Sequence, residues 1–357
     1  MNWKHLVKLG GFALAASCSL GAYAADGLNA TISMDKRALG PRDDVLVHVT
    51  LTNTSSAPQY VLKWHTPFGE IEESLFDVTR DGVKVPYLGM HAKRPAPTPA
   101  DYYVIQPGKS HKVTVELSQM YNMSVTGDYS IRYSTKAMKL FSDMDPQGKT
   151  VDKKQPDTLQ SEPLSVWIDG TLPRGSQPKL SAEPLATGAS LSFNKCTTSQ
   201  QADITSARSA ALNMATDGDA YLGSGKTGPR YTKWFGTVTT SRYNTAKSHF
   251  AAIKDAFANK PITVDCGCKK TYYAYVYPTQ PYTIYVCKAF WSAPMTGTDS
   301  KGGTLVHEMS HFNVVASTDD WAYGQSAASS LALSDPDKAL DNADSHEYFG
   351  ENTPAQQ

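Results

Sequence analysis

The residues best suited to chemistry in this 357-residue sequence are His307, Glu308 and His311, which form a His-Glu-x-x-His run. On a helix, side chains four positions apart project from one face, so both imidazoles can bind a single Zn²⁺. The glutamate then lies beside the metal, where it can handle a water molecule. A catalytic zinc takes three protein ligands and keeps a fourth position open. The run therefore predicts a zinc site that is one ligand short.

Several carboxylates and one histidine could complete this site. Asp320 lies nine residues after His311, beyond an expected helix break at 316–318 that would let the chain turn back toward the metal. Asp319 is adjacent, and spacing alone does not choose between the two. His346 and Glu347 are further candidates for the third ligand. The residues by themselves leave this choice open.

A zinc-stabilised binding protein or toxin could use the same metal ligands. A structural zinc site closes its fourth position and has no use for a base. Glu308 between the two histidines therefore favours a hydrolase over a binding protein.

The residues that must position this site, from about 190 to the C-terminus, alternate between helical and strand patterns. We expect helices over Gln201–Met214, Thr245–Phe257, Gly303–Val315, Ala322–Leu333 and Pro336–Asn342, and a hairpin of Tyr272–Tyr277 with Thr283–Cys287. Asp335 and Pro336 suit the N-cap and first turn of the last helix. This half of the chain is predicted to be α+β and mainly helical.

Residues 25–170 instead read as short strands separated by turn signals such as Asp81-Gly82 and Gly127-Asp128. This spacing predicts an antiparallel β-sandwich of immunoglobulin-like type. Its four histidines are scattered, and each is expected to be a surface or strand residue rather than a ligand: His48, His65, His91 and His111. No catalytic chemistry is predicted in this half.

The N-terminus and the cysteines indicate export. Residues 1–24 combine early lysines, an apolar run and small residues at a cleavage spacing, which is typical of a signal peptide. Without it, Cys196, Cys266, Cys268 and Cys287 remain, and an even number in an exported chain predicts two disulfides. A linker rich in Pro, Gly, Ser and Thr at 171–189 is an expected processing site. Because 34 basic residues balance 34 acidic ones, neither a nucleic-acid nor a membrane-surface partner is predicted.

The zinc motif and its downstream residues resemble the signature of the aspzincin, deuterolysin-type (M35-like) metallopeptidases. That signature combines HExxH with a GTxDxxYG motif, and the latter is matched here from Ser317 through Asp320 and Tyr323 to Gly324. The sequence departs from the family with Ser317 in place of glycine, which is tolerated if the turn needs no positive φ. The resemblance implies Asp320 as the third zinc ligand and Tyr323 as a hydrogen-bond donor to the tetrahedral oxyanion.

Over about 190–357 the resemblance is closer to the peptidyl-Lys metalloendopeptidase subgroup, preceded by a bacterial-type N-terminal propeptide. It implies that Asp344 and Glu347 hold the ammonium of a substrate lysine in the S1′ pocket, which suits two carboxylates three residues apart. It also implies the disulfides Cys196–Cys266 and Cys268–Cys287. The expected mechanism uses one Zn²⁺ to lower the pKa of a water toward about 7, with Glu308 as general base.

A peptidase of this type would be complete without residues 25–170, so these are expected to form a propeptide that assists folding and blocks the site. We expect a secreted, monomeric zymogen that acts on proteins and peptides. One of the lysines in the 136–154 stretch is predicted to fill the Asp344/Glu347 pocket. The alternative is an aspzincin of broad specificity whose β-domain is retained as a binding module for substrate or a surface.

Overall fold

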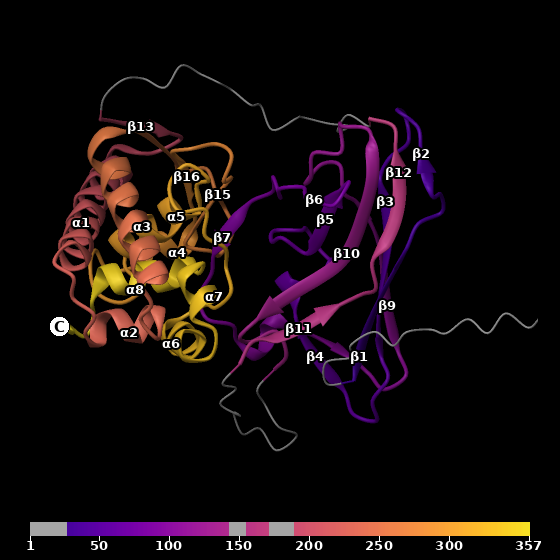
Figure 1. Ribbon diagram of the computed structural model, residues 1–357. Coiled ribbons are helices and arrows are strands. Elements are labelled where there is room, and N and C mark those ends of the chain that lie inside the picture. Colours follow the sequence, from indigo (N-terminus) through magenta and orange to yellow (C-terminus); the bar gives the residue numbers. More distant parts are fainter. Residues whose placement is uncertain (1–26, 143–154, 171–188) are drawn as a thin grey trace, which may run out of the picture.

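The computed structural model describes residues 27–142, 155–170 and 189–357, which form two regions that lie side by side (Figure 1). We call residues 27–170 the N-terminal region and residues 189–357 the C-terminal region. The predicted signal peptide and nearly all of the predicted linker lie outside the described residues. Within the described residues, helices and strands are both abundant, so the predicted α+β class is confirmed. None of the described helices is long and apolar enough to cross a membrane.

The N-terminal region consists of strands that share one hydrophobic core. Its first sheet has the order β1 (Leu28–Ser33), β3 (Leu46–Asn53), β9 (Ser110–Glu116). Its second sheet has the order β2 (Ala38–Leu39), β12 (Leu164–Ile168), β10 (Gly127–Ala137), β5 (Phe76–Arg80), β6 (Val83–Lys84), and β11 (Asp157–Gln160) pairs with β10. A separate pair joins β4 (Gln59–Leu62) to β8 (Tyr102–Ile105), and the 3₁₀ turns are Lys63–His65 and Pro99–Asp101.

Alternation of buried and exposed residues explains how the two larger sheets are held together. Every second residue of β3 and β10 is buried, including Val49 and Ile131, and side chains from both sheets join a single core. This agrees with the predicted sandwich, while its immunoglobulin-like type stays a prediction. The prediction that all strands are antiparallel is wrong at one edge, because β2 pairs parallel to β12.

The C-terminal region packs helices around a small mixed sheet. The sheet contains β13 (Ser190–Asn194), β14 (Pro261–Asp265), β16 (Thr283–Val286) and β15 (Ala274–Val276), with β15 antiparallel to the other three. The helices are α1 (Thr198–Gly223), α2 (Pro229–Phe235), α3 (Thr240–Asn259), α4 (Lys288–Ser292), α5 (Lys301–His311), α6 (Gln325–Ser334), α7 (Pro336–Leu340) and α8 (Ala343–Glu351). The hairpin and the two long helices are confirmed.

Several predicted helix boundaries are wrong, including the end of α1, which runs to Gly223 instead of Met214, and the start of α6, which begins at Gln325 instead of Ala322. The helix that carries the zinc motif ends at His311 rather than Val315, because Phe312 is extended and the N–H of Asn313 donates to the Pro278 carbonyl 3.1 Å away. The last predicted helix stops at Leu340, and α8 was not predicted. Ser317 has φ 53°, so the turn does adopt the left-handed conformation that favours glycine.

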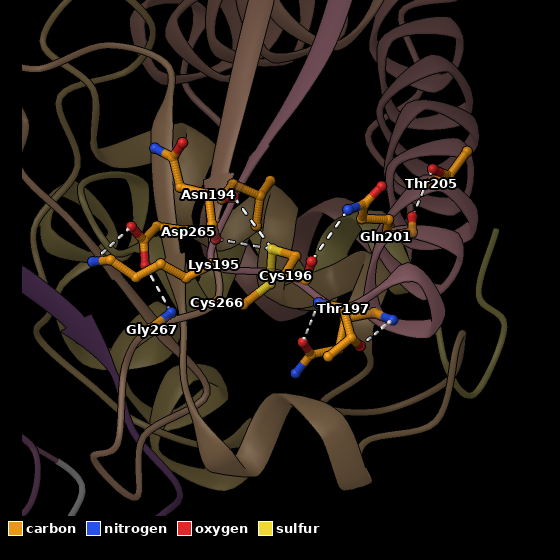
Figure 2. The surroundings of a disulfide bond; sticks show 11 residues. Asn194, Lys195, Cys196, Thr197, Gln201, Thr205, Asp265, Cys266 and Gly267 are labelled. Atoms are coloured by element: carbon orange, nitrogen blue, oxygen red, sulfur yellow. Dashed lines mark hydrogen bonds and ion pairs between the residues drawn. A yellow bond between two sulfur atoms is a disulfide. The ribbon is translucent and has the colours of Figure 1, made fainter.

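Both disulfides connect the segments that the family resemblance implied. Cys196–Cys266 joins the ends of the parallel strands β13 and β14, with 5.0 Å between the Cα atoms (Figure 2). Thr197 then caps α1 by accepting from the Gln200 N–H, so the disulfide also fixes the start of this helix. Cys268–Cys287 joins the loop after β14 to the residue that precedes α4.

One strand of the N-terminal region belongs to the sheet of the C-terminal region. β7 (His91–Lys93) extends from the former and pairs antiparallel with β15, so the sheet order is β13-β14-β16-β15-β7 (Figure 1). The N–H of Tyr273 donates to the Lys93 carbonyl, 3.0 Å away. This pairing was not predicted, and it places residues 91–94 beside α5.

Candidate active site

The helix α5 presents His307 and His311 toward the same point. Their Nε2 atoms lie 3.1 Å apart, and the Asp320 carboxylate oxygens lie 3.4 Å from each of them. All three side chains are buried. These separations match those between ligand atoms around a tetrahedral zinc, which are about 3.3 Å for bonds near 2.0 Å.

The polar atoms of this cluster fit a cation. Both Asp320 carboxylate oxygens are buried without a hydrogen-bond donor among the described residues. His311 Nδ1 donates to the Thr318 carbonyl at 2.8 Å, and His307 Nδ1 lies 2.8 Å from Asp344, so both Nε2 lone pairs face inward. Two facing lone pairs beside an unpaired carboxylate are costly to bury unless a metal ion binds them. The donor set of two imidazoles and a carboxylate suits Zn²⁺.

Asp320 reaches this point because Asn342 fixes the loop after α5. The buried Asn342 side chain accepts from the N–H groups of Trp321 and Ala322, at 2.9 and 3.0 Å. Sequence analysis missed Asn342, although it directly precedes the helix that carries Asp344. The three rivals for the third position have other partners: Asp319 accepts from the Asp320 N–H, His346 contacts His249 at 2.9 Å, and Glu347 pairs with Lys93 Nζ at 2.6 Å.

Glu308 is fully buried next to the cluster of His307, His311 and Asp320. Its Oε1 lies 3.4 Å from the backbone nitrogen of Lys93, which donates to it. Burial raises the pKa of Glu308 to about 7, although the neighbouring imidazoles of His307 and His311 act to lower it. A carboxylate with such a pKa can take up and release a proton near neutral pH.

Tyr323 contacts the same backbone segment, residues 92–93, from the other side. Its hydroxyl lies 3.3 Å from the Ala92 carbonyl oxygen and 2.8 Å from Glu73, to which it donates. Burial raises the pKa of Tyr323 well above its usual value, so the hydroxyl keeps its proton. The Ala92–Lys93 peptide bond therefore lies between a carboxylate and a hydroxyl donor.

The Lys93 side chain is fully buried in an acidic pocket. Its Nζ lies 2.6 Å from Glu347, 3.3 Å from Asp344 and 3.3 Å from Asp299. Tyr273 and Tyr348 present ring faces to the ammonium, with centroids 5.1 and 5.7 Å away. Burial acts to lower the pKa of Lys93, but the three carboxylates outweigh it and raise the pKa well above its usual value.

This pocket brings together Asp344 and Glu347 as the sequence predicted, and it adds Asp299. No spacing signal pointed to Asp299, which precedes the N-cap of α5 and meets α8 only through the fold. The occupant differs from the prediction. Of the predicted lysines, Lys149, Lys153 and Lys154 lie outside the described residues. Lys136 forms an ion pair with Asp335 at 3.0 Å, since β10 carries it toward α7 instead.

His91 lies in a strand, as predicted, but it also packs against the cluster of candidate metal ligands. Its ring stacks on that of His311 with centroids 4.9 Å apart, and its Nδ1 lies 3.4 Å from Asp319. A ligand atom of His91 lies within 4.8 Å of those of His311 and Asp320. Sequence analysis did not foresee that a residue of the N-terminal region lies beside the site, and the prediction that this region carries no catalytic chemistry stays a prediction.

Comparisons with known proteins find peptidases among the relatives of this chain. The family model described as lysine-specific metallo-endopeptidase, Aspzincin M35, matches residues 220–351. An "Extracellular protease" of Aeromonas hydrophila is 48% identical over 93% of this chain and 94% of its own. A "Peptidyl-Lys metalloendopeptidase" of Armillaria mellea is 38% identical over 88% of this chain and 89% of its own.

A solved zinc peptidase from Grifola frondosa is 48% identical, covers 45% of this chain and 100% of its own, and superposes with a TM-score of 0.44. The long relatives are similar over both regions, well beyond the segment that carries the zinc motif. The chain therefore belongs to the aspzincin family of metalloendopeptidases.

Proposed function

We propose that this chain is the secreted, latent precursor of a zinc endopeptidase that cleaves on the amino side of lysine. The observation that carries the proposal is the position of residues 92–93. Lys93 fills the acidic pocket while the bond that precedes it lies between Glu308 and Tyr323. A peptide substrate bound in the same way would present lysine at P1′, with the preceding carbonyl as the one attacked.

The metal site would be formed by His307, His311 and Asp320. Zn²⁺ bound there would lower the pKa of a water and polarise the scissile carbonyl. Asp344 supports the site by accepting from His307 Nδ1, so this residue serves both the metal ligand and the lysine pocket.

Glu308 acts as the general base in this proposal. Its carboxylate takes a proton from the attacking water and delivers it to the leaving amine. The contact between Glu308 Oε1 and the Lys93 nitrogen supports the second transfer, because that nitrogen occupies the place of the leaving group. Tyr323 donates to the carbonyl oxygen as negative charge develops on it.

The N-terminal region keeps the precursor latent by filling the cleft with a bond that resembles a substrate. Tyr323 has a single hydroxyl hydrogen, and Glu73 accepts it at the shorter distance, 2.8 Å against 3.3 Å for the Ala92 carbonyl. We infer that Glu73 withholds the oxyanion donor and protects the Ala92–Lys93 bond. Proteolysis in the 171–189 linker would then allow the N-terminal region to leave.

Mapping of cleavage sites on a denatured protein tests the specificity. The released enzyme should cut before lysine, and Glu308→Gln should abolish cutting while zinc content is kept. Cuts without bias toward lysine at P1′ would favour the alternative, an aspzincin of broad specificity. N-terminal sequencing of the secreted form tests latency: a start between about 174 and 190 supports a propeptide, whereas a start near residue 25 supports a retained binding module.

A further inference from the structure

The bound strand β7 also marks the subsites on either side of the cleaved bond. We take β7, which pairs with β15, as the model of a bound substrate that is cleaved between Ala92 and Lys93. His91 is then the second residue before the cleaved bond, and Arg94 is the second residue after it. In protease terms these side chains occupy S2 and S2′. Their surroundings show which contacts remain when the N-terminal region leaves.

The contacts of Arg94 come mainly from its own region. Its guanidinium pairs with Glu72 and Glu73, both of the N-terminal region, and the C-terminal region supplies the ring face of Tyr272, 4.8 Å away. The carboxylates would depart with Arg94. The released enzyme therefore keeps no acidic partner of Arg94 at S2′ among the described residues.

His91, by contrast, contacts residues of the C-terminal region, which remain in the released enzyme. Its ring stacks on His311, and its Nδ1 lies 3.4 Å from Asp319 Oδ1, both of the C-terminal region. The other ring packed against His91 belongs to Tyr87 of the N-terminal region, with centroids 5.6 Å apart. A cavity of about 300 Å³ adjoins this contact, and His91, His311, Ser317, Asp319 and Asp341 are among the residues that line it.

Asp319 is held in place by the backbone on both sides. Its N–H donates to the Asp341 carbonyl at 2.7 Å, and its carbonyl accepts from the Ala343 N–H at 3.0 Å. Its Oδ1 accepts from the Asp320 N–H at 2.9 Å, while its side chain stays 33% exposed. A fixed, partly exposed carboxylate beside the cleft can recognise a side chain that donates a hydrogen bond.

We propose that Asp319 determines specificity at S2, where it favours histidine or a basic side chain over an acidic one at P2. The His311 ring provides the platform on which the P2 side chain packs. This inference rests on the proposed function, because it takes β7 as the model of a bound substrate. Under this inference, lysine at P1′ is the main requirement for cleavage, and the side chain at P2 has a smaller influence.

Quenched fluorescent peptides with the sequence His-Ala-Lys-Arg, and the same peptides with Arg, Ala or Glu in place of His, test the inference. With enzyme released from the full-length chain, kcat/KM should be about fivefold higher for His or Arg than for Glu, as expected for a partly exposed charge. Asp319→Asn keeps an oxygen that can accept from the Asp320 N–H but loses the charge, so it should reduce this ratio to about one. Zinc content, measured in parallel, verifies that the metal site is intact.

Asp341→Asn is the matched control, because Asp341 lines the same cavity without contacting His91, and it should leave the ratio unchanged. Equal kcat/KM for all four peptides with the wild-type enzyme would overturn the inference whether or not any variant folds. A preserved ratio in Asp319→Asn would overturn it too. Failure of the proposed function looks different, since the peptides would then not be cut between Ala and Lys at all.

Discussion

Lys93 and Arg94 are neighbours in the chain and both are buried, yet their acidic partners come from different regions. The carboxylates around Lys93 all belong to the C-terminal region: Asp299, Asp344 and Glu347. Those around Arg94, Glu72 and Glu73, belong to the N-terminal region. Under the proposed function, the first cluster stays with the released enzyme, whereas the second leaves together with the N-terminal region. Only the first would then be available to select a substrate.

The two clusters would also block the enzyme in different ways. Lys93 occupies the place of a substrate side chain, so it competes for the pocket. The Arg94 cluster instead engages Tyr323, the proposed oxyanion donor, because Glu73 accepts from its hydroxyl. Arg94 also donates to the Ala92 carbonyl at 3.1 Å. Latency under our proposal uses both, and variants can separate them.

The largest effect is expected in the pocket of the released enzyme. Glu347→Gln removes the carboxylate nearest to the lysine ammonium, so the buried cation loses part of its compensating negative charge. The kcat/KM for lysyl peptides should therefore fall by about 10²- to 10³-fold. Glu351→Gln is the control: it lies one turn further along α8 and accepts from Ser300, outside the pocket. If Glu347→Gln cut lysyl peptides as well as Glu351→Gln does, the pocket would not be the specificity site.

Lys93→Met in the full-length chain should have the next largest effect. It leaves Asp344 and Glu347 buried without a cation, at a cost of about 3–5 kcal/mol, so the N-terminal region should bind more weakly. The uncleaved chain should then hydrolyse a lysyl peptide about 100-fold faster than the wild-type precursor does. Lys136→Met breaks the ion pair with Asp335 and is the control. Equal latency in the two variants would rule out Lys93 as the blocking residue.

The zinc helix and Lys93 show which parts of the site could be predicted from the sequence and which could not. The zinc helix was predicted because its signal is local, with both histidines and the glutamate within five positions of one helix. The choice of Asp320 over Asp319 needed the family motif, since the turn that separates their side chains depends on the distant Asn342. Spacing along the chain does not record such a contact.

Lys93 could not be found in the same way. Its strand is three residues long and has no alternating pattern, since all three residues are buried. Its partner strand and Glu308 come from the other region, and Glu308 is 215 residues away. Charge complementarity predicts that a lysine fills the pocket. The stretch 136–154 was favoured because it contains several lysines. Position in the fold, and not the local density of charge, decided which lysine it is.

A smaller effect should follow from freeing Tyr323 while Lys93 stays bound. Glu73→Ala in the full-length chain lets the Tyr323 hydroxyl donate to the Ala92 carbonyl, which should raise the rate of self-cleavage at Ala92–Lys93 about tenfold. Mass spectrometry would detect a fragment that begins at Lys93. The double variant Glu73→Ala with Glu308→Gln should give none. Absence of the fragment from Glu73→Ala as well would mean that Glu73 does not protect this bond.

The smallest effect concerns the buried contact between His346 and His249, which belongs to neither the Lys93 cluster nor the Arg94 cluster. His346 donates from Nδ1 to the Asn342 carbonyl, so its Nε2 accepts from His249 Nδ1, 2.9 Å away on α3. Burial lowers the pKa of His346 to about 3 and that of His249 to about 4. Both folded-state values lie below the usual value of 6.5, so the unfolded chain binds more protons below that pH. Stability should therefore be lost as the pH falls from about 6.5 to 4, by up to about 1.4 kcal/mol per pH unit for each histidine.

His249→Asn keeps an N–H donor for His346 but does not titrate. Thermal unfolding between pH 7 and pH 4.5 should show a shallower loss of stability in this variant than in the wild type, by about half if the pair dominates the slope. Latency at neutral pH should be unchanged, because His346 faces α3 whereas Asp344 and Glu347 face Lys93. A change in latency would show that the two faces of α8 are coupled. An identical pH slope would mean that groups other than this pair control acid unfolding.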